Sequence, residues 1–322
     1  MNKHKISVII PCYNSFTYMD RCFRYLTEQT FKDFEIIVVD DCSTDNTLSY
    51  LQKYVSCSAL DIKIIHNDKN LGPGKSRNVG IKNASGEWLT FCDADDWYPE
   101  DRFEKMLAVS ENVDCVICNY SKVYHNGKTK KCDYLSNIRS KALKEDIIAL
   151  ALMSLCVCMI KKEIAVAEPI ADLYNGEDYA TVPLWFQRCD SIAIITDSLY
   201  FYFMRDGSAS RKPSVTAYIN LKKAFDYMAE RSYDCYKDSV EFLGVFQILY
   251  GGVLVALKAG VKKTEVEKYV ATFESDYPDW SKNKYIRYLS KSKRVFVHVV
   301  KNGHYGTARI MAYLHGLILR LR

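Results

Sequence analysis

The sequence predicts an α/β fold: a mostly parallel central sheet with helices between its strands, followed by a helical C-terminal region. Two observations support this prediction. Over the first 120 residues, apolar runs rich in Val and Ile alternate with segments of helical periodicity, and from about residue 214 the pattern is helical almost throughout. The chain of 322 residues is 48% hydrophobic, which suffices for a buried core and excludes a disordered protein.

The expected strands are apolar along their whole length, as in a parallel sheet covered by helices on both faces. They lie at 5–10, 34–40, 61–66, 87–93 and 114–120. Helices are expected between them, at 17–29, 44–55 and 99–110. Ligands of such sheets bind at the carboxyl ends of the strands. We therefore expect the functional site in the loops after the first, second and fourth strands.

Residues 121–213 are expected to complete the same domain. Its further elements are a helix at 143–154, a strand at 155–160, a helix at 178–189 and strands at 191–196 and 199–204. A first domain is thus expected at 1–213, with two parts at 1–120 and 121–213. In the helical region, 214–322, helices are expected at 214–232, 236–258 and 263–275, while VFVHVV at 295–300 has the pattern of a strand.

The first two strands end in loops with different chemical signals. Pro11-Cys12-Tyr13-Asn14 lacks the GxGxxG pattern that seats a dinucleotide pyrophosphate, which argues against a nicotinamide enzyme. The second strand ends in Asp40-Asp41, and the residues that follow can already cap the next helix. The two carboxylates diverge, so one of them can face the ligand cleft and accept hydrogen bonds from a nucleobase or a sugar.

Cations and carboxylates follow the third and fourth strands. Lys75 and Arg77 lie in the first turn of an expected helix, where they oppose the helix dipole unless an anion such as phosphate binds there. The fourth strand ends in Asp93-Ala94-Asp95-Asp96. Asp93 and Asp95 lie on the same side of an extended chain, and such oxygen ligands suit Mg²⁺ or Mn²⁺ bound together with phosphate oxygens.

Four motifs in this order, PCYN, VVDDCSTDNT, GPGKSRNVGI and DADDW, resemble those of the family 2 glycosyltransferases of bacterial polysaccharide type, which have the GT-A fold. The similarity covers about residues 5–210. It implies that 1–213 is a catalytic domain, with a nucleotide-binding half at 1–120 and an acceptor half at 121–213. It implies that the protein binds a nucleotide-diphosphate sugar, with Pro11 and Tyr13 beside the nucleoside, Asp41 bonded to the base and Arg77 in contact with the nucleotide.

The same resemblance implies roles for the acidic residues. Asp93 would face the ribose or the metal shell, and Asp95 would be the direct ligand of Mn²⁺ or Mg²⁺. In Asn175-Gly176-Glu177-Asp178, Asp178 matches the family's general base and Glu177 its partner, although two acids at a helix start are also ordinary N-terminal chemistry. Arg205 begins a segment similar to the family's R-x-G-S, Arg205-Asp206-Gly207-Ser208, and would help to hold the diphosphate.

The implied reaction is inverting transfer of a sugar from a nucleotide-diphosphate donor, expected to be a UDP-sugar. The acceptor is expected to be a hydroxyl of a saccharide or lipid-linked saccharide in cell-surface polysaccharide synthesis. The alternatives are a polyprenyl-phosphate sugar synthase and, from a different class, a non-catalytic nucleotide-sugar-binding protein. A glycoside hydrolase also uses paired carboxylates but needs neither a nucleotide pocket nor a D-x-D metal site.

The net charge of +5 is unevenly distributed: residues 281–322 contain ten Lys and Arg and no Asp or Glu. Within this segment, 307–322 is amphipathic, with its apolar side chains on one helical face: Ile310, Met311, Leu314, Leu317, Ile318 and Leu321. This helix either packs on the protein or lies on an anionic membrane surface. No nucleic-acid motif is present, so no nucleic-acid partner is expected. Cysteines scattered through apolar runs indicate a reducing compartment, so we expect the protein in the cytoplasm. If the basic helix lies on a membrane, that surface would be the inner face of the cell membrane.

Overall fold

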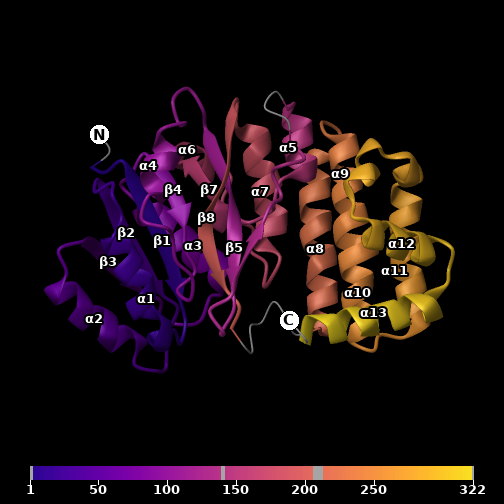
Figure 1. Ribbon diagram of the computed structural model, residues 1–322, viewed down its shortest axis with the longest axis horizontal. Coiled ribbons are helices and arrows are strands. Elements are labelled where there is room, and N and C mark those ends of the chain that lie inside the picture. The colour runs from indigo at the N-terminus through magenta and orange to yellow at the C-terminus, as the bar shows by residue number, and fades with distance from the viewer. Residues whose placement is uncertain (1–2, 139–141, 206–212, 321–322) are drawn as a thin grey trace. The chain divides into compact units, whose positions relative to one another are not determined.

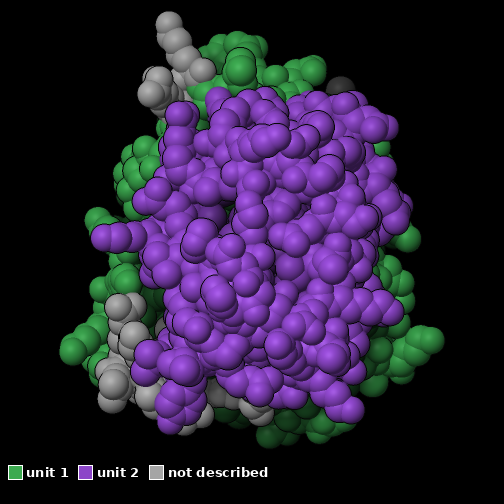
Figure 2. All heavy atoms as spheres, turned by 90° about the vertical axis from the view of Figure 1, so that its right-hand side faces the viewer, with its two compact units in different colours: residues 1–144, 151–206 green, residues 145–150, 207–322 purple. Residues whose placement is uncertain are grey.

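The structure is a computed structural model that describes residues 3–138, 142–205 and 213–320. The chain forms two compact units (Figures 1 and 2). Unit 1 comprises residues 1–144 and 151–206, and unit 2 comprises residues 145–150 and 207–322. The structure thus divides the chain at 206/207, near the boundary expected at 213/214, and assigns the short segment 145–150 to the C-terminal unit.

Unit 1 is built on one mixed sheet with the order β3-β2-β1-β4-β7-β5-β6, in which β8 also pairs with β5. Its strands are Ile6–Cys12 (β1), Phe34–Asp40 (β2), Asp61–His66 (β3), Trp88–Phe91 (β4), Cys115–Val123 (β5), Thr129–Cys132 (β6), Cys158–Lys161 (β7) and Ile192–Phe203 (β8). Strand β7 runs antiparallel to both β4 and β5, so β5 and its parallel partner β8 point the same way as β1 to β4. The predicted mostly parallel sheet is confirmed, with β7 inserted in the antiparallel direction between β4 and β5.

The helices of unit 1 follow the strands closely along the chain (Figure 1). They are Phe16–Thr27 (α1), Thr47–Cys57 (α2), Pro73–Asn83 (α3), Arg102–Leu107 (α4), Lys162–Ala167 (α6) and Glu177–Arg188 (α7), and a 3₁₀ turn, Leu155–Val157 (η1), precedes β7. The strands expected at 191–196 and 199–204 are one strand, β8, whose pairing with β5 shifts register near Asn119.

Helix α3 lies unusually close to the sheet. A Cβ added to Gly80 would lie 2.5 Å from Cγ2 of Ile9 on β1, so only glycine allows this approach. Every residue of β2, and six of the seven residues of β1, are buried. This dry contact fixes α3, and the loop that precedes it, relative to the carboxyl ends of β1 and β2.

Every element of secondary structure described in unit 2 is a helix. Its elements are Lys144–Leu150 (α5), Val215–Ser232 (α8), Lys237–Gly244 (α9), Val245–Gly252 (η3, a π-helix), Val253–Lys258 (α10), Lys263–Asp276 (α11), Trp280–Lys282 (η4), Lys284–Tyr288 (η5), Lys291–Lys301 (α12) and Tyr305–Arg320 (α13). Side chains tie α5 to this unit: Ser239 donates to the Glu145 carbonyl at 2.7 Å, and the Tyr285 hydroxyl bonds Asp146 at 2.8 Å.

The prediction of a strand at 295–300 is wrong, because these residues belong to helix α12. Ser290 caps this helix by accepting a hydrogen bond from the Lys293 backbone amide. Phe296, Val297 and Val300 are buried, which is the i, i+1, i+4 spacing of a helix face. Burial on that face therefore outweighs the β propensity of the valines.

The continuous helix Lys237–Lys258 is long and apolar enough to cross a membrane. Most of its most apolar stretch is buried inside the protein, however, as in the core helix of a globular unit. Two glycines let neighbouring helices reach it: a Cβ on Gly244 would lie 2.3 Å from the Phe273 ring, and one on Gly252 would lie 2.4 Å from the Tyr269 hydroxyl. The buried-helix prediction for 242–257 fits this packing.

Helix α13 packs on α10 and α12 of its own unit. Among its described side chains it buries Tyr305, Ala308 and Ala312, which lie outside the apolar face predicted from the sequence. Three members of that face, Leu317, Ile318 and Leu321, lie outside the side chains that the structure describes. On the predicted face, Ile310 and Leu314 are 63% and 51% exposed, and nearby Tyr313 is 66% exposed. The helix thus docks through one tyrosine and two alanines and leaves Ile310, Tyr313 and Leu314 largely in solvent.

Candidate active site

The loops after β1 and β2 are bonded to each other. The Asn14 side-chain oxygen accepts hydrogen bonds from the backbone amides of Thr44, at 2.8 Å, and Asp45, at 3.3 Å. Asn14 itself has a φ of 49°, a left-handed conformation that asparagine tolerates better than most residues. On this rigid edge Pro11 is half-buried at the end of β1, and Tyr13 is 48% exposed. The Tyr13 ring is therefore accessible to a flat ligand such as a base.

Asp41 is buried and organises the loop that leads into α3. One carboxylate oxygen accepts hydrogen bonds from the Asn67 side chain and the Leu71 amide, and the other accepts one from the Gly72 amide, each at 2.8 Å. Gly72 has a φ of 84°, which favours glycine at this turn. The structure gives Asp41 a loop-holding role, and its contact with a base stays a prediction.

Arg77 connects two acidic segments that are far apart in the sequence. It projects from α3, is almost fully buried, and donates from Nη1 to Glu177 at 2.9 Å and from Nη2 to Asp93 at 2.6 Å. Burial opposes its charge, but the carboxylates of Asp93, Glu177 and Asp178 raise the pKa of Arg77 well above its ordinary value. Arg77 therefore holds together the β4 loop and the start of α7, and its direct contact with a nucleotide stays a prediction.

Helix α3 also positions the segment before α7. Asn78 bonds Ile170 in both directions, donating to its carbonyl at 2.8 Å and accepting from its amide at 3.0 Å. A Cβ on Gly74 would lie 3.1 Å from the Ala171 carbonyl oxygen, so glycine permits this close approach. Asn175 and Gly176 then adopt positive φ angles of 64° and 99°, which turn the chain into α7.

Asp178 lies in the first turn of α7 and is half-buried. Its Oδ1 is buried and has no hydrogen-bond partner among the described residues. Burial and the neighbouring Glu177 raise the pKa of Asp178 to about 7, against the opposing effect of Arg77. A carboxylate with an unpartnered oxygen and a pKa near neutrality is suited to accept a proton.

The three aspartates after β4 lie close together: ligand oxygens of Asp93, Asp95 and Asp96 are all within 4.8 Å of one another. Asp96 is fully buried and accepts hydrogen bonds from the Tyr200 hydroxyl and, at 2.7 Å, from the Phe203 amide. Burial and the charges of Asp95 and Asp93 raise its pKa well above the ordinary value. Asp96 thus anchors β8 to this loop, leaving Asp93 and Asp95 as the carboxylates nearer the surface.

Asp95 is surrounded by two arginines. Arg205, just after β8, pairs with the Asp95 carboxylate at 2.6 Å from Nε to Oδ2. Arg21 on α1 donates to the Asp95 backbone carbonyl at 2.6 Å and has its guanidinium within 4.2 Å of the Trp97 and Phe203 ring centres. Burial and Asp93 raise the pKa of Asp95, against Arg205 and Arg21. The rest of the expected R-x-G-S segment, residues 206–208, lies outside the described residues.

Arg77 joins Asp93 to Glu177 and Arg205 pairs with Asp95, whereas Pro11, Tyr13 and Asp41 lie at the ends of β1 and β2. Sequence reasoning did not identify Arg21, Asn78 or Tyr200, which position the acidic segments. A side chain such as Arg21 has no local motif, because its partners come from the β4 loop and β8. Asp93 and Asp95 present carboxylate oxygens close together and nearer the surface than Asp96, and oxygen ligands of this kind fit a hard divalent ion.

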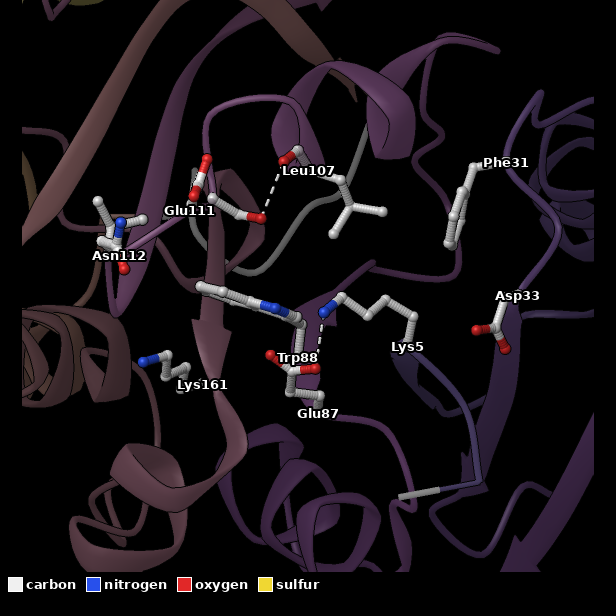
Figure 3. A pocket seen from close by; sticks show the side chains of 11 residues that line it. Lys5, Phe31, Asp33, Glu87, Trp88, Leu107, Glu111, Asn112 and Lys161 are labelled. Atoms are coloured by element: carbon white, nitrogen blue, oxygen red, sulfur yellow. Dashed lines mark hydrogen bonds and ion pairs between the residues drawn. The ribbon is translucent and has the colours of Figure 1, made fainter. Parts of the chain in front are cut away.

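A separate cavity of about 620 Å³ opens at the opposite edge of the same sheet (Figure 3). It is lined by Lys5 and Asp33, just before β1 and β2, and by Glu87 and Trp88 at the start of β4. Lys5 is paired with Glu87 at 2.7 Å. Because the predicted site residues follow the strands at their carboxyl ends, this cavity is not the site described above.

Comparison with known proteins agrees with this geometry. Residues 7–165 match the model of Glycosyl transferase family 2. The chain is 35% identical to the putative glycosyltransferase EpsH of Bacillus subtilis over 152 residues, 47% of this chain and 44% of EpsH. It is 30% identical to the poly(ribitol-phosphate) beta-N-acetylglucosaminyltransferase TarS of Staphylococcus aureus over 204 residues, 62% of this chain and 35% of TarS.

Solved structures show the same fold. The structure of S. aureus TarS 1–349 in complex with UDP-GlcNAc has a TM-score of 0.69 at 23% identity, covering 97% of this chain and 92% of that one. The mannosyltransferase PcManGT from Pyrobaculum calidifontis, in complex with GDP-Man and Mn²⁺, has a TM-score of 0.53 at 14% identity, covering 98% and 87%. The sheet and its acidic edge define a GT-A fold. Residues 7–165 thus form a domain of glycosyltransferase family 2, and the chain is similar to bacterial glycosyltransferases such as EpsH and TarS.

Proposed function

We propose that this chain is an inverting glycosyltransferase that moves a sugar from a nucleotide-diphosphate donor, a UDP-sugar, to a hydroxyl of a saccharide or lipid-linked saccharide in cell-surface polysaccharide synthesis. The observation that carries this proposal is Asp178: a half-buried carboxylate with a raised pKa and an unpartnered oxygen, linked through Glu177 and Arg77 to Asp93. The chain spans less than half the length of EpsH and TarS, so its substrates are inferred from the site.

Each part of the site has a role in this reaction. Tyr13 and Pro11 border the nucleoside, Asp41 bonds the base from the loop it organises, and Arg77 supports the nucleotide side of the cleft. Asp178 takes the proton of the acceptor hydroxyl. At the same time the hydroxyl oxygen attacks the anomeric carbon of the donor sugar, on the face opposite the diphosphate. A positioned general base is worth about 10²–10⁴ in rate. Glu177 holds Asp178 in place through its ion pair with Arg77.

The acidic edge fits a divalent cation, Mn²⁺ or Mg²⁺, with Asp95 as its direct ligand and Asp93 beside it. Such an ion supplies positive charge that stabilises the diphosphate leaving group. Structures of similar proteins support the ligand classes: TarS has been solved in complex with UDP-GlcNAc and with UDP, and PcManGT in complex with GDP-Man and Mn²⁺.

A panel of nucleotide sugars tests the proposal. We expect a UDP-sugar to raise the melting temperature of the protein when Mn²⁺ is present, and Mn²⁺-dependent release of UDP once an acceptor is added. Stabilisation without UDP release for any acceptor would indicate the non-catalytic binder instead. Transfer to polyprenyl phosphate alone would indicate the sugar synthase. The absence of stabilisation by every nucleotide sugar would contradict both the enzyme and the binder.

We also infer that unit 2 attaches the enzyme to the anionic inner face of the cell membrane, in the cytoplasm. Unit 2 contains 20 Lys and Arg against 12 Asp and Glu, and 281–322 contains no acidic residue. Helix α13 adds the exposed apolar side chains of Ile310, Tyr313 and Leu314, at i, i+3 and i+4. Apolar side chains on a basic helix suit the interface of an anionic bilayer.

Replacing Ile310, Tyr313 and Leu314 together by serine is expected to weaken binding to phosphatidylglycerol-containing vesicles, measured by co-sedimentation, about tenfold or more. The reason is that each apolar side chain buried in the bilayer interface contributes roughly 1.5–3 kcal/mol. The matched control replaces Val215 and Ile219, two exposed apolar residues of α8, and should bind like wild type. The membrane assignment would be refuted if the α13 variant bound anionic vesicles as well as wild type does. It would also be refuted if wild type bound neutral vesicles as well as anionic ones. A change in oligomeric state of the α13 variant would indicate that a second copy covers the helix.

A further inference from the structure

The carboxylate that the proposed metal would bind is already paired in the structure. Oδ2 of Asp95 lies 2.6 Å from Nε of Arg205, and the Asp95 side chain is only 18% exposed. A divalent ion bound to this carboxylate would lie within a few ångströms of the guanidinium. Like charges at about 4 Å repel strongly in a partly buried site, so the ion and Arg205 compete for Asp95.

The two arginines of the site differ in how firmly they are held. Arg77 is buried and donates to two carboxylates from two nitrogen atoms. Its departure would leave Asp93 and Glu177 without their counter-ion, so the two negative charges would repel each other. Arg205 is 38% exposed, and its close contact with Asp95 lacks the alignment of a hydrogen bond at Nε. Arg205 is therefore the cation that can move.

The backbone of Asp95 would stay in place during such a movement. Arg21 holds the Asp95 carbonyl, and its guanidinium lies over the rings of Trp97 and Phe203. The β8 segment before Arg205 is fixed as well, because the Phe203 amide donates to the buried Asp96. Movement can then be confined to the Arg205 side chain, which also lies over the Tyr18 ring at 5.5 Å.

We propose that Arg205 is an exchangeable counter-ion: it neutralises Asp95 in the empty enzyme, is displaced when a divalent cation binds, and then pairs with the diphosphate of the donor. This inference rests on the proposed metal- and donor-binding function and adds the coupling between the two ligands. A guanidinium matches phosphate oxygens in a fork geometry, so the released side chain gains a partner only when the diphosphate is present. Metal and nucleotide consequently strengthen each other's binding, by the same factor in each direction.

Calorimetric titration of Mn²⁺, without nucleotide and with saturating UDP, tests the exchange. In Arg205→Gln we expect Mn²⁺ alone to bind about tenfold more tightly than in wild type, because the competing cation is gone. The factor by which UDP strengthens Mn²⁺ binding should fall in the same variant. Arg205→Lys, which keeps a cation, should stay close to wild type. A purely structural role for Arg205 would weaken Mn²⁺ binding or leave it unchanged.

Arg188→Gln is the matched control, because Arg188 is also partly exposed and pairs with a less exposed carboxylate, Glu168, at 2.9 Å. Its Mn²⁺ affinity should equal that of wild type. Equal Mn²⁺ affinities in wild type and Arg205→Gln, with normal UDP binding, would overturn the exchange and leave the proposed function intact. The absence of Mn²⁺ binding in both proteins would remove the metal site and, with it, the exchange.

Discussion

Replacing Asp178 by asparagine is expected to abolish glycosyl transfer while leaving donor binding nearly unchanged. Asparagine keeps the size of the side chain but cannot accept the acceptor's proton, so we expect turnover to fall by about 10²–10⁴. Donor binding should persist, because Pro11, Tyr13 and Asp41 lie in other loops of the same edge. Turnover by released UDP and donor affinity by calorimetry measure the two effects separately.

The same variant has an expected effect on stability. The folded protein raises the pKa of Asp178 to about 7, so the folded state prefers the protonated carboxyl. The resulting stabilisation is present at low pH and is lost as the pH rises towards 7, where the buried carboxyl must ionise. Asp178→Asn should therefore be more stable than wild type at pH 8, by on the order of 1 kcal/mol, and gain little at pH 4.

Near-normal turnover of this variant would exclude Asp178 as the base.

Replacing Asp95 by alanine is expected to abolish the dependence of nucleotide binding on Mn²⁺. The variant removes the proposed direct metal ligand, so UDP affinity measured with Mn²⁺ should fall about tenfold or more, to the value found with chelator. Asp197→Ala is a suitable control: Asp197 is an exposed aspartate that pairs with Lys105 at 2.8 Å in the same unit. Unchanged UDP affinity of Asp95→Ala, with and without Mn²⁺, would refute the metal assignment.

Much of the fold could be predicted because its signals are local. Apolar runs identified β1 to β5, and six of the eight strands point in one direction as expected. The insertion of β7 between β4 and β5 could not be predicted, because its pairing depends on partners about 40 and 70 residues away along the chain. The helical state of 295–300 depends on burial of Phe296, Val297 and Val300 against its own unit, which a β-propensity pattern does not contain.

For the site, too, local features could be predicted and contacts between distant residues could not. The D-x-D motif indicated a cluster of carboxylates, and those of Asp93 and Asp95 do lie together; the roles of Asp95 and Asp178 stay predictions. The sequence alone could not show that Arg77 bridges Asp93 and Glu177, since Arg77 and Glu177 are 100 positions apart. The sequence also could not predict the burial of Arg102 on α4, whose side chain donates to the carbonyls of Leu199 and Cys156. Such cations satisfy backbone groups from several elements, so no short pattern identifies them.

One measurement tests the central claim most directly: release of UDP from a UDP-sugar by wild type, Asp178→Asn and Asp95→Ala in a single assay with an acceptor, with Mn²⁺ and with chelator. We expect Mn²⁺-dependent release by wild type, loss of release by Asp178→Asn although it still binds the donor, and loss of the Mn²⁺ dependence in Asp95→Ala. Release by Asp178→Asn at the wild-type rate, or equal wild-type release with Mn²⁺ and with chelator, would contradict the account.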